Sequence, residues 1–133
     1  MTELHLKTTA AELGATAEEG IGVVVIGGSL DFSIHELVVE FMDRAFDRFG
    51  PDLILDLTGL DLLDSRATGL IVLCWKRSLE EGGELSLVAT ERGATRILWI
   101  TGLTMRIRAF PTLREALDAR RTAEQGDRPE RSA

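Results

Sequence analysis

The 133-residue sequence predicts a single α/β domain, in which a mixed β-sheet of about four to five strands packs against about four α-helices. Two observations support this fold class. After two N-terminal strands, short apolar runs alternate with longer segments whose apolar residues recur at helical spacing. The apolar content of 44% is ordinary for a globular protein, and the length suits one hydrophobic core but not two domains.

Two strands are expected before the first helix. Leu4 to Thr8 alternates apolar and polar residues, as a half-exposed strand does, whereas the small and acidic stretch from Ala10 to Gly20 predicts a loop. Ile21 to Ile26 is β-branched and almost entirely apolar, which predicts a central strand. The glycines of the next stretch, Gly27 to Asp31, permit a tight turn.

The first helix is expected to begin at Ser33. Glu36 lies three residues later, so the two residues match the capping-box pattern. The helix ends at Gly50-Pro51. Its apolar face is predicted to contain Leu37, Val38, Phe41, Ala45, Phe46 and Phe49.

The middle of the chain predicts a strand followed closely by a helix. Leu53 to Leu57 is a short apolar run typical of a buried strand, and Leu70 to Leu79 has the spacing of a helix packed on one side. Between them, Asp64 and Ser65 are both suited to cap the helix N-terminus. A phosphate on the Ser65 hydroxyl would meet unpaired N–H groups and the positive end of the helix dipole.

The C-terminal part continues the alternation of strands and helices. Gly82-Gly83 ends the second helix, and Leu85 to Ala89 alternates as a strand. Arg92 to Ile100 predicts a short helix, and Met105 to Phe110 is a strand candidate. Pro111 suits the first turn of a last helix.

The last residues are polar and charged from Thr122 onward, which predicts a flexible tail. We therefore expect a domain over residues 1–119 and a tail over residues 120–133.

Several classes of site and location are disfavoured. No apolar run approaches the roughly 20 residues of a membrane span, and the N-terminus lacks the plan of a signal peptide. Cys74 has no disulfide partner, which suits a reducing cytoplasm, and His5 and His35 are too isolated to suggest a metal site. We expect a cytoplasmic protein without a metal, and no enzyme, because no nucleophile–base pair or phosphate-binding loop is evident.

The charge is unevenly distributed along the chain. Residues 1–64 hold 13 acidic and 3 basic residues, whereas residues 65–113 hold 4 acidic and 7 basic ones. An acidic N-terminal half disfavours a nucleic acid as partner, because that contact requires dense Lys and Arg. It favours a protein partner with a basic face, although a solvated acidic surface is the commoner explanation of such a count.

Three motifs, in order, give the chain a family resemblance. They are GGSLD at Gly27–Asp31, DSRATG at Asp64–Gly69 and ITGLTMRIRAFPTLREAL at Ile100–Leu117. Together they resemble the G-x-L/I-D, D-S-S/T-G-L-G and C-terminal motifs of the STAS-domain anti-sigma factor antagonists of bacteria. The resemblance extends from about Leu4 to Ala119 and implies the STAS fold.

The resemblance also implies a function. In this family the serine that corresponds to Ser65 accepts a phosphate from an anti-sigma factor that is a serine kinase, and a phosphatase removes it. The unmodified protein captures the anti-sigma factor and releases the sigma factor, for example in a stress response. ATP would belong to the partner, so no bound cofactor is expected, and the chain would be a monomer or weak homodimer. The implied partner-binding residues are Ser29, Asp31, Asp64, Arg66 and Thr68.

Simpler interpretations of these residues remain open. Ser65 or Asp64 would be a plain helix cap, and Asp31 would form an Asx turn after a strand. Arg66 would be a solvated first-turn residue and Thr68 a helix-surface residue. In addition, SRATG replaces the SSGLG of the family, so Ala67 occupies a position that is usually glycine, and a cation follows the predicted phosphoacceptor.

Two other functions compete with this one. A STAS module that binds a ligand or a larger assembly without phosphorylation is compatible with the SRATG sequence. A receiver domain phosphorylated at Asp56 would need an acidic pair after the first strand and a lysine late in the chain. Neither is evident, because the only lysines are Lys7 and Lys76.

Overall fold

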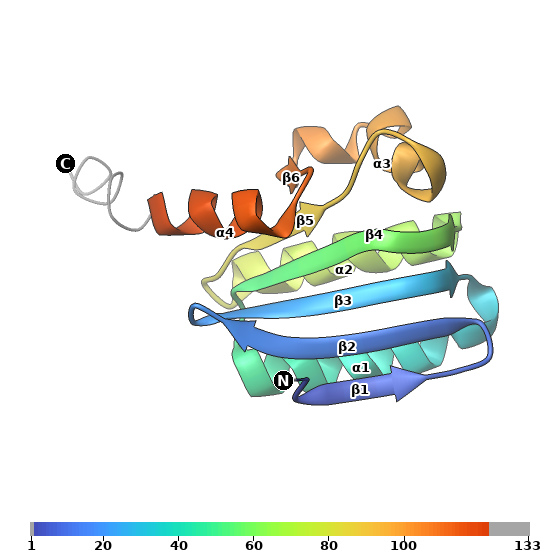
Figure 1. Cartoon of the computed structure of the whole chain (residues 1–133), viewed down its shortest axis with the longest axis horizontal. Coiled ribbons are helices and arrows are strands. Elements are labelled where there is room, and N and C mark those ends of the chain that lie inside the picture. The colour runs from blue at the N-terminus through green and yellow to red at the C-terminus, as the bar shows by residue number, and fades with distance from the viewer. Residues whose placement is uncertain (1, 123–133) are drawn as a thin grey trace.

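The computed structural model describes residues 2–122, which form six strands and four α-helices (Figure 1). The strands are β1 (Leu4–Lys7), β2 (Ala11–Glu18), β3 (Ile21–Leu30), β4 (Leu53–Leu63), β5 (Leu85–Val88) and β6 (Ala109–Phe110). The α-helices are α1 (His35–Phe49), α2 (Ser65–Glu80), α3 (Arg96–Ile100) and α4 (Leu113–Thr122). Three short 3-10 turns are η1 (Phe32–Ile34), η2 (Gly93–Thr95) and η3 (Leu103–Met105). The predicted α/β class is confirmed, and the sheet has one strand more than the four to five expected.

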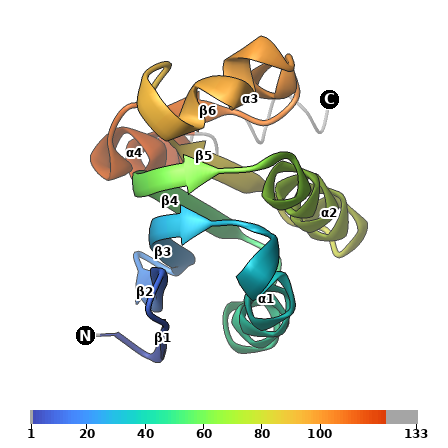
Figure 2. The same cartoon turned by 90° about the vertical axis from the view of Figure 1, so that its right-hand side faces the viewer.

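The strands form one mixed sheet in sequence order, β1-β2-β3-β4-β5-β6. The first three strands are antiparallel neighbours, and β3 to β6 are parallel. Helices α1 and α2 lie on one face of the sheet and α4 lies on the other (Figure 2). Because β3 and β4 are adjacent and parallel, the turns that follow them, which lead into α1 and α2, meet at the same end of the sheet.

Two hydrophobic clusters hold these layers together. The larger lies between the sheet and α1 and α2, and includes Leu13, Val24, Phe41, Leu55 and Ile71. The smaller lies under α4 and contains Val23, Ile54, Val88, Ala116 and Leu117. Val23 and Val24 belong to different clusters because consecutive strand residues point to opposite faces of the sheet.

The loop predicted over residues 10–20 is wrong, because this stretch forms β2. Ala11, Leu13 and Ala15 are buried on one face of the strand, and the residues between them face outward. The buried side chains are mostly small, so the buried and outward-facing residues of β2 differ little in hydrophobicity. Pairing with β1 and β3 on both sides stabilises a strand that its composition does not favour.

The predicted capping box is also wrong. Helix α1 begins at His35, and no side chain caps it. Instead, Ser33 lies within η1, and its hydroxyl donates to Asp31 Oδ1 at 2.5 Å. The carboxylate of Asp31, two residues before Ser33, therefore provides a cap, but for η1 and not for α1.

Strands β3 and β4 both extend beyond their predicted ends. The glycine-containing stretch after Ile26 continues β3 to Leu30, with register shifts between Val25 and Gly27 and between Gly28 and Ser29. Strand β4 continues to Leu63, so it leads directly into α2. By contrast, only Ala109 and Phe110 of the strand candidate over residues 105–110 are in β conformation.

Helix α4 continues to Thr122, past the domain boundary predicted at residue 119. Arg120 is only 6% exposed, and its guanidinium donates to Ser86 Oγ and to the carbonyl oxygens of Leu53 and Glu84. Residues 120–122 of the predicted tail thus belong to α4, and residues 123–133 lie outside the described part of the chain.

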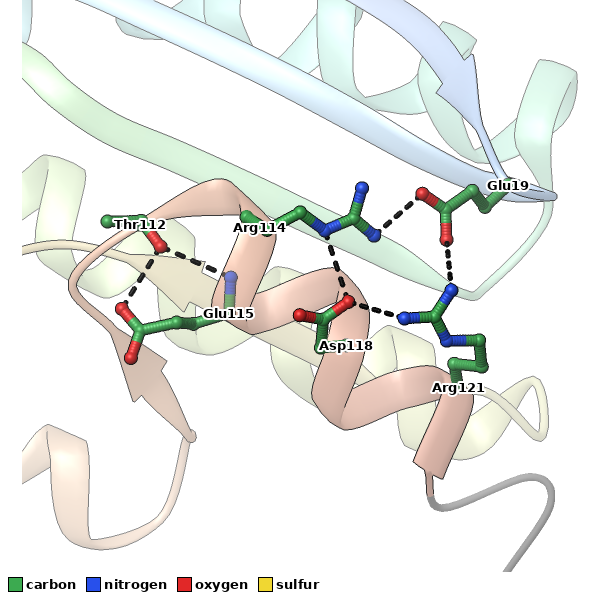
Figure 3. A network of polar contacts seen from close by, with 6 residues as sticks. All are labelled: Glu19, Thr112, Arg114, Glu115, Asp118 and Arg121. Carbon is green, nitrogen blue, oxygen red and sulfur yellow. Dashed lines mark hydrogen bonds and ion pairs between the residues drawn. The ribbon is translucent and has the colours of Figure 1, made fainter.

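The outer side of α4 is joined to the β2–β3 turn by ion pairs (Figure 3). Arg114 donates to Glu19 Oε2 at 2.7 Å and to Asp118 Oδ1 at 3.1 Å. Arg121 donates to the same Asp118 oxygen at 2.7 Å. The network is exposed, so its contribution to stability is small beside that of the apolar cluster beneath the helix.

Candidate functional site at the N-terminus of helix α2

Ser65 is the first residue of α2, directly after the N-cap residue Asp64. The Asp64 carboxylate accepts a hydrogen bond from the backbone N–H of Ala67 at 2.9 Å, so Asp64 is the side-chain cap. Ser65 is exposed, and within residues 2–122 its hydroxyl makes no hydrogen bond. The hydroxyl is thus presented to solvent at the positive end of the helix dipole.

Thr68 lies beneath this first turn. Its side chain is only 9% exposed, and its hydroxyl donates to the carbonyl oxygen of Asp64 at 3.0 Å. The interpretation of Thr68 as a helix-surface residue is therefore wrong. Thr68 fixes the turn that carries Ser65 and offers a partner little surface of its own.

Asp31 occupies the equivalent position at the end of β3. It is the N-cap of η1, and its Oδ1 accepts from the backbone N–H of Ser33 at 2.8 Å and from the Ser33 hydroxyl. The Ser33 hydroxyl and backbone N–H lower the pKa of the Asp31 carboxyl, because both stabilise the carboxylate. Asp31 is therefore charged at neutral pH and forms the Asx turn weighed as its simpler interpretation.

The sheet brings Asp31 and Ser65 to one end of the molecule. Leu30 pairs with Leu63 in the parallel register, and the backbone N–H of Asp64 donates to the carbonyl oxygen of Leu30 at 3.2 Å. Figure 2 views this end of the molecule, where β3 leads into α1 and β4 into α2.

Ser29 lies just inside this end. It is half-buried on β3, opposite Leu62 of β4, and its backbone N–H donates to the carbonyl oxygen of Ala10 at 2.9 Å. Its position supports the turn that carries Asp31, and only part of its surface faces outward.

Arg66 makes a contact that the sequence analysis missed. Its guanidinium carbon lies 4.0 Å from the centre of the Phe32 ring, and both residues are exposed. The contact joins η1 to the first turn of α2 beside Ser65. Arg66 is thus held against an aromatic ring and is not simply a solvated residue. The one hint in the sequence is that Phe32 is an aromatic residue directly after the GGSLD motif.

Neither a metal centre nor a membrane span emerges from the described residues. Within residues 2–122, no three His, Cys, Asp or Glu side chains are placed to share a metal ion. No helix in the same range combines the length and apolarity needed to cross a bilayer. The features that distinguish this end of the molecule are therefore a free hydroxyl, two capping carboxylates and one stacked cation.

Comparison with known proteins places the chain in a family. The chain is 29% identical over 85 residues to the anti-sigma F factor antagonist of Paenibacillus polymyxa, a match that covers 63% of this chain and 73% of that protein. The crystal structure of an anti-sigma factor antagonist from Mycobacterium paratuberculosis matches with a TM-score of 0.76 at 23% identity, covering 86% of this chain and 97% of that one. The family model for the STAS domain matches residues 13–116 of the sequence. The chain therefore belongs to the STAS domain family.

Proposed function

We propose that this protein is an anti-sigma factor antagonist that binds an anti-sigma factor kinase and releases a sigma factor, and that phosphorylation of Ser65 ends the interaction. The observation that carries the proposal is the exposed Ser65 hydroxyl at the start of α2, which makes no hydrogen bond to any other described residue. The similarity to the Paenibacillus polymyxa protein supports the class of partner.

The charges around Ser65 support an electrostatic mechanism. A phosphate would add about −1.5 to −2 charges at neutral pH. Asp64 is adjacent, and Asp31 lies at the end of the neighbouring strand. A partner surface that fits the neutral hydroxyl would then meet repulsion and a desolvation cost. Losing two or three charge-assisted contacts of roughly 1.5–3 kcal/mol each would weaken binding by several powers of ten.

The folded state should tolerate the phosphate. Ser65 is exposed, and a phosphate at a helix N-terminus is stabilised by the helix dipole. The modification would therefore change the surface without refolding the domain. Ser29, Asp31, Asp64 and Arg66 would surround the contact, with Thr68 supporting the turn from below.

The direct experiment is intact mass spectrometry after incubation with ATP and the anti-sigma factor kinase of the same organism. The proposal predicts a gain of one phosphate in the wild-type chain and none in Ser65→Ala. A complex that turns over ATP while Ser65 stays unmodified would refute the phosphorylation step.

A second function is favoured by one observation. Arg66 is adjacent to Ser65, and a cation there would neutralise part of a phosphate charge. This favours a STAS module that binds a ligand or acts as a scaffold in a regulatory complex, without phosphorylation. Binding of the anti-sigma factor that is equal for the wild-type chain and for Ser65→Asp would support this alternative.

A further inference from the structure

Two arginines of this chain stack on phenylalanine rings, but their surroundings differ. The guanidinium carbon of Arg77 lies 4.2 Å from the centre of the Phe46 ring, and that of Arg66 lies 4.0 Å from the centre of the Phe32 ring. Arg77 also donates to Asp43 Oδ1 and to Glu81 Oε2, each at 2.8 Å. Arg77 is thus an arginine whose charge is neutralised within the domain.

Arg66 has no such carboxylate within the described part of the chain. Among residues 2–122, no ion pair or hydrogen bond engages its guanidinium. The two nearby acidic side chains are committed elsewhere, because Asp64 caps α2 and Asp31 caps η1. Stacking covers a face of the guanidinium and leaves its in-plane N–H donors available, in the fork that matches a carboxylate.

The position of this cation is fixed from both sides. Phe32 begins η1, which is anchored by the Asp31 cap and by the buried side chain of Ile34. Arg66 belongs to the first turn of α2, which is anchored by the Asp64 cap and by Thr68. The stacked pair, Arg66 and Phe32, therefore presents a pre-oriented donor group that loses little conformational entropy on binding.

We propose that the Arg66–Phe32 pair is a recognition element for the protein partner, in which Arg66 receives a carboxylate of that partner and Phe32 both holds the guanidinium and provides an apolar contact. The inference rests on the proposed function and specifies the chemistry of the partner surface beside Ser65. Phe32 is 62% exposed despite the stacked guanidinium, so most of its surface is open to a partner.

A carboxylate on a protein fits this site better than a polyanion does. Among the described residues a single stacked cation is held here, and the two elements that carry the pair are capped by the carboxylates of Asp31 and Asp64. Binding of a nucleic acid requires many phosphate contacts, and these acidic neighbours oppose it. A single Asp or Glu side chain in a bidentate pair needs one guanidinium and leaves room for the neighbours.

The test is calorimetric titration of the anti-sigma factor kinase with the wild-type chain, Arg66→Gln, Phe32→Leu and the double variant. We expect Arg66→Gln to weaken binding about 10- to 100-fold, as for an arginine at the centre of an interface. Phe32→Leu should weaken binding less. Its effect should shrink in the Arg66→Gln background, because the ring acts partly through the cation. Phe32→Tyr should retain wild-type affinity.

The matched control is Arg44→Gln. Arg44 is an exposed arginine on α1 without an ion pair among the described residues, and its replacement changes the net charge equally. It should leave the Kd near the wild-type value. Circular dichroism and the thermal midpoint should match the wild-type chain for all variants, since both members of the pair are exposed. The affinity of Arg66→Gln should also depend less on salt concentration.

Three results would overturn the inference. The first is wild-type affinity of Arg66→Gln, and the second is an equal loss in Arg44→Gln. The third is a loss confined to the ATP-bound kinase, which would identify a nucleotide phosphate as the anion. If Arg66→Gln binds normally while Ser65→Asp does not, only this inference fails. If the wild-type chain does not bind the kinase, both this inference and the proposed function fail.

Discussion

The backbone N–H of Asp64 donates a hydrogen bond to the carbonyl oxygen of Leu30 across 3.2 Å. This bond joins the last residue of β3 to the residue that caps α2, so the two turns after the parallel strands are tied to each other. The position of Ser65 relative to Asp31 is therefore set by backbone pairing, and side-chain changes at the surface should leave it intact.

The Asp64 cap should contribute measurably to stability. We expect Asp64→Ala to lower the free energy of unfolding by about 1 kcal/mol, because the N–H of Ala67 loses its acceptor. Asp64→Asn should lose less, because an amide oxygen can accept the same bond. Urea titration measures both. Asp61→Ala, a change at an exposed residue of β4, is the control, and an equal loss there would contradict the capping role.

Gly28 should be far less replaceable than its neighbour Gly27. Gly28 has a φ of +87°, and a Cβ there would collide with the carbonyl oxygen of Ala10. A Cβ on Gly27 would meet only an ordinary contact, 3.5 Å from the carbonyl oxygen of Gly59. We expect Gly28→Ala to cost about 1–3 kcal/mol more than Gly27→Ala in denaturant unfolding. Equal costs would show that the backbone of β3 relaxes freely at Gly28.

Replacement of Arg120 should destabilise the domain more than replacement of most other polar residues. Arg120→Ala removes donors to Ser86 Oγ at 3.1 Å, to the Leu53 carbonyl at 2.8 Å and to the Glu84 carbonyl at 2.7 Å. Because these acceptors lie under α4, we expect a loss of about 2–4 kcal/mol.

The neighbouring arginine provides the comparison for Arg120. Arg121→Ala breaks only exposed ion pairs and should cost less than about 1 kcal/mol. Chemical denaturation of both variants checks this difference, and a similar loss for the two would contradict the anchoring role of Arg120.

Cys74 should be protected from thiol reagents in the folded state. Burial raises the pKa of the Cys74 thiol to about 12, from an ordinary value of 9.0. At pH 8 we expect slow modification by a disulfide reagent, and fast modification after addition of urea. The chain has no tyrosine, so thiolate absorbance at high pH can be followed without interference from tyrosinate.

The same pKa shift predicts a dependence of stability on pH. Above about pH 9 an unfolded thiol releases its proton while the folded one retains it, so the free energy of unfolding falls as the pH rises from 9 toward 12. Cys74→Val should lack this part of the decline. A thiol that titrates near pH 9 in the folded protein would contradict the burial argument.

The fold class and the capped start of α2 were predictable because their signals are local. The apolar run of β4, the helical spacing of α2 and the cap at Asp64 each depend on a few neighbouring residues. The strand β2 was missed because its buried side chains are mostly alanines, and only pairing with β1 and β3 makes it a strand.

The missed features involve residues far apart in sequence. Phe32 and Arg66 meet only because β3 and β4 are parallel neighbours, which no local pattern reveals. Arg120 was assigned to the tail because the side chain of an arginine among polar residues is normally exposed to solvent. Its burial follows from the carbonyl groups that the sheet presents beneath α4.

The Kd of the anti-sigma factor kinase for Ser65 variants tests the central claim most directly. By calorimetry, Ser65→Ala should bind as tightly as the wild-type chain, whereas Ser65→Asp should bind at least about tenfold more weakly, because a charge enters beside Asp64. Arg44→Gln controls for the net-charge change. Equal affinity of Ser65→Ala and Ser65→Asp would contradict an electrostatic switch at this hydroxyl.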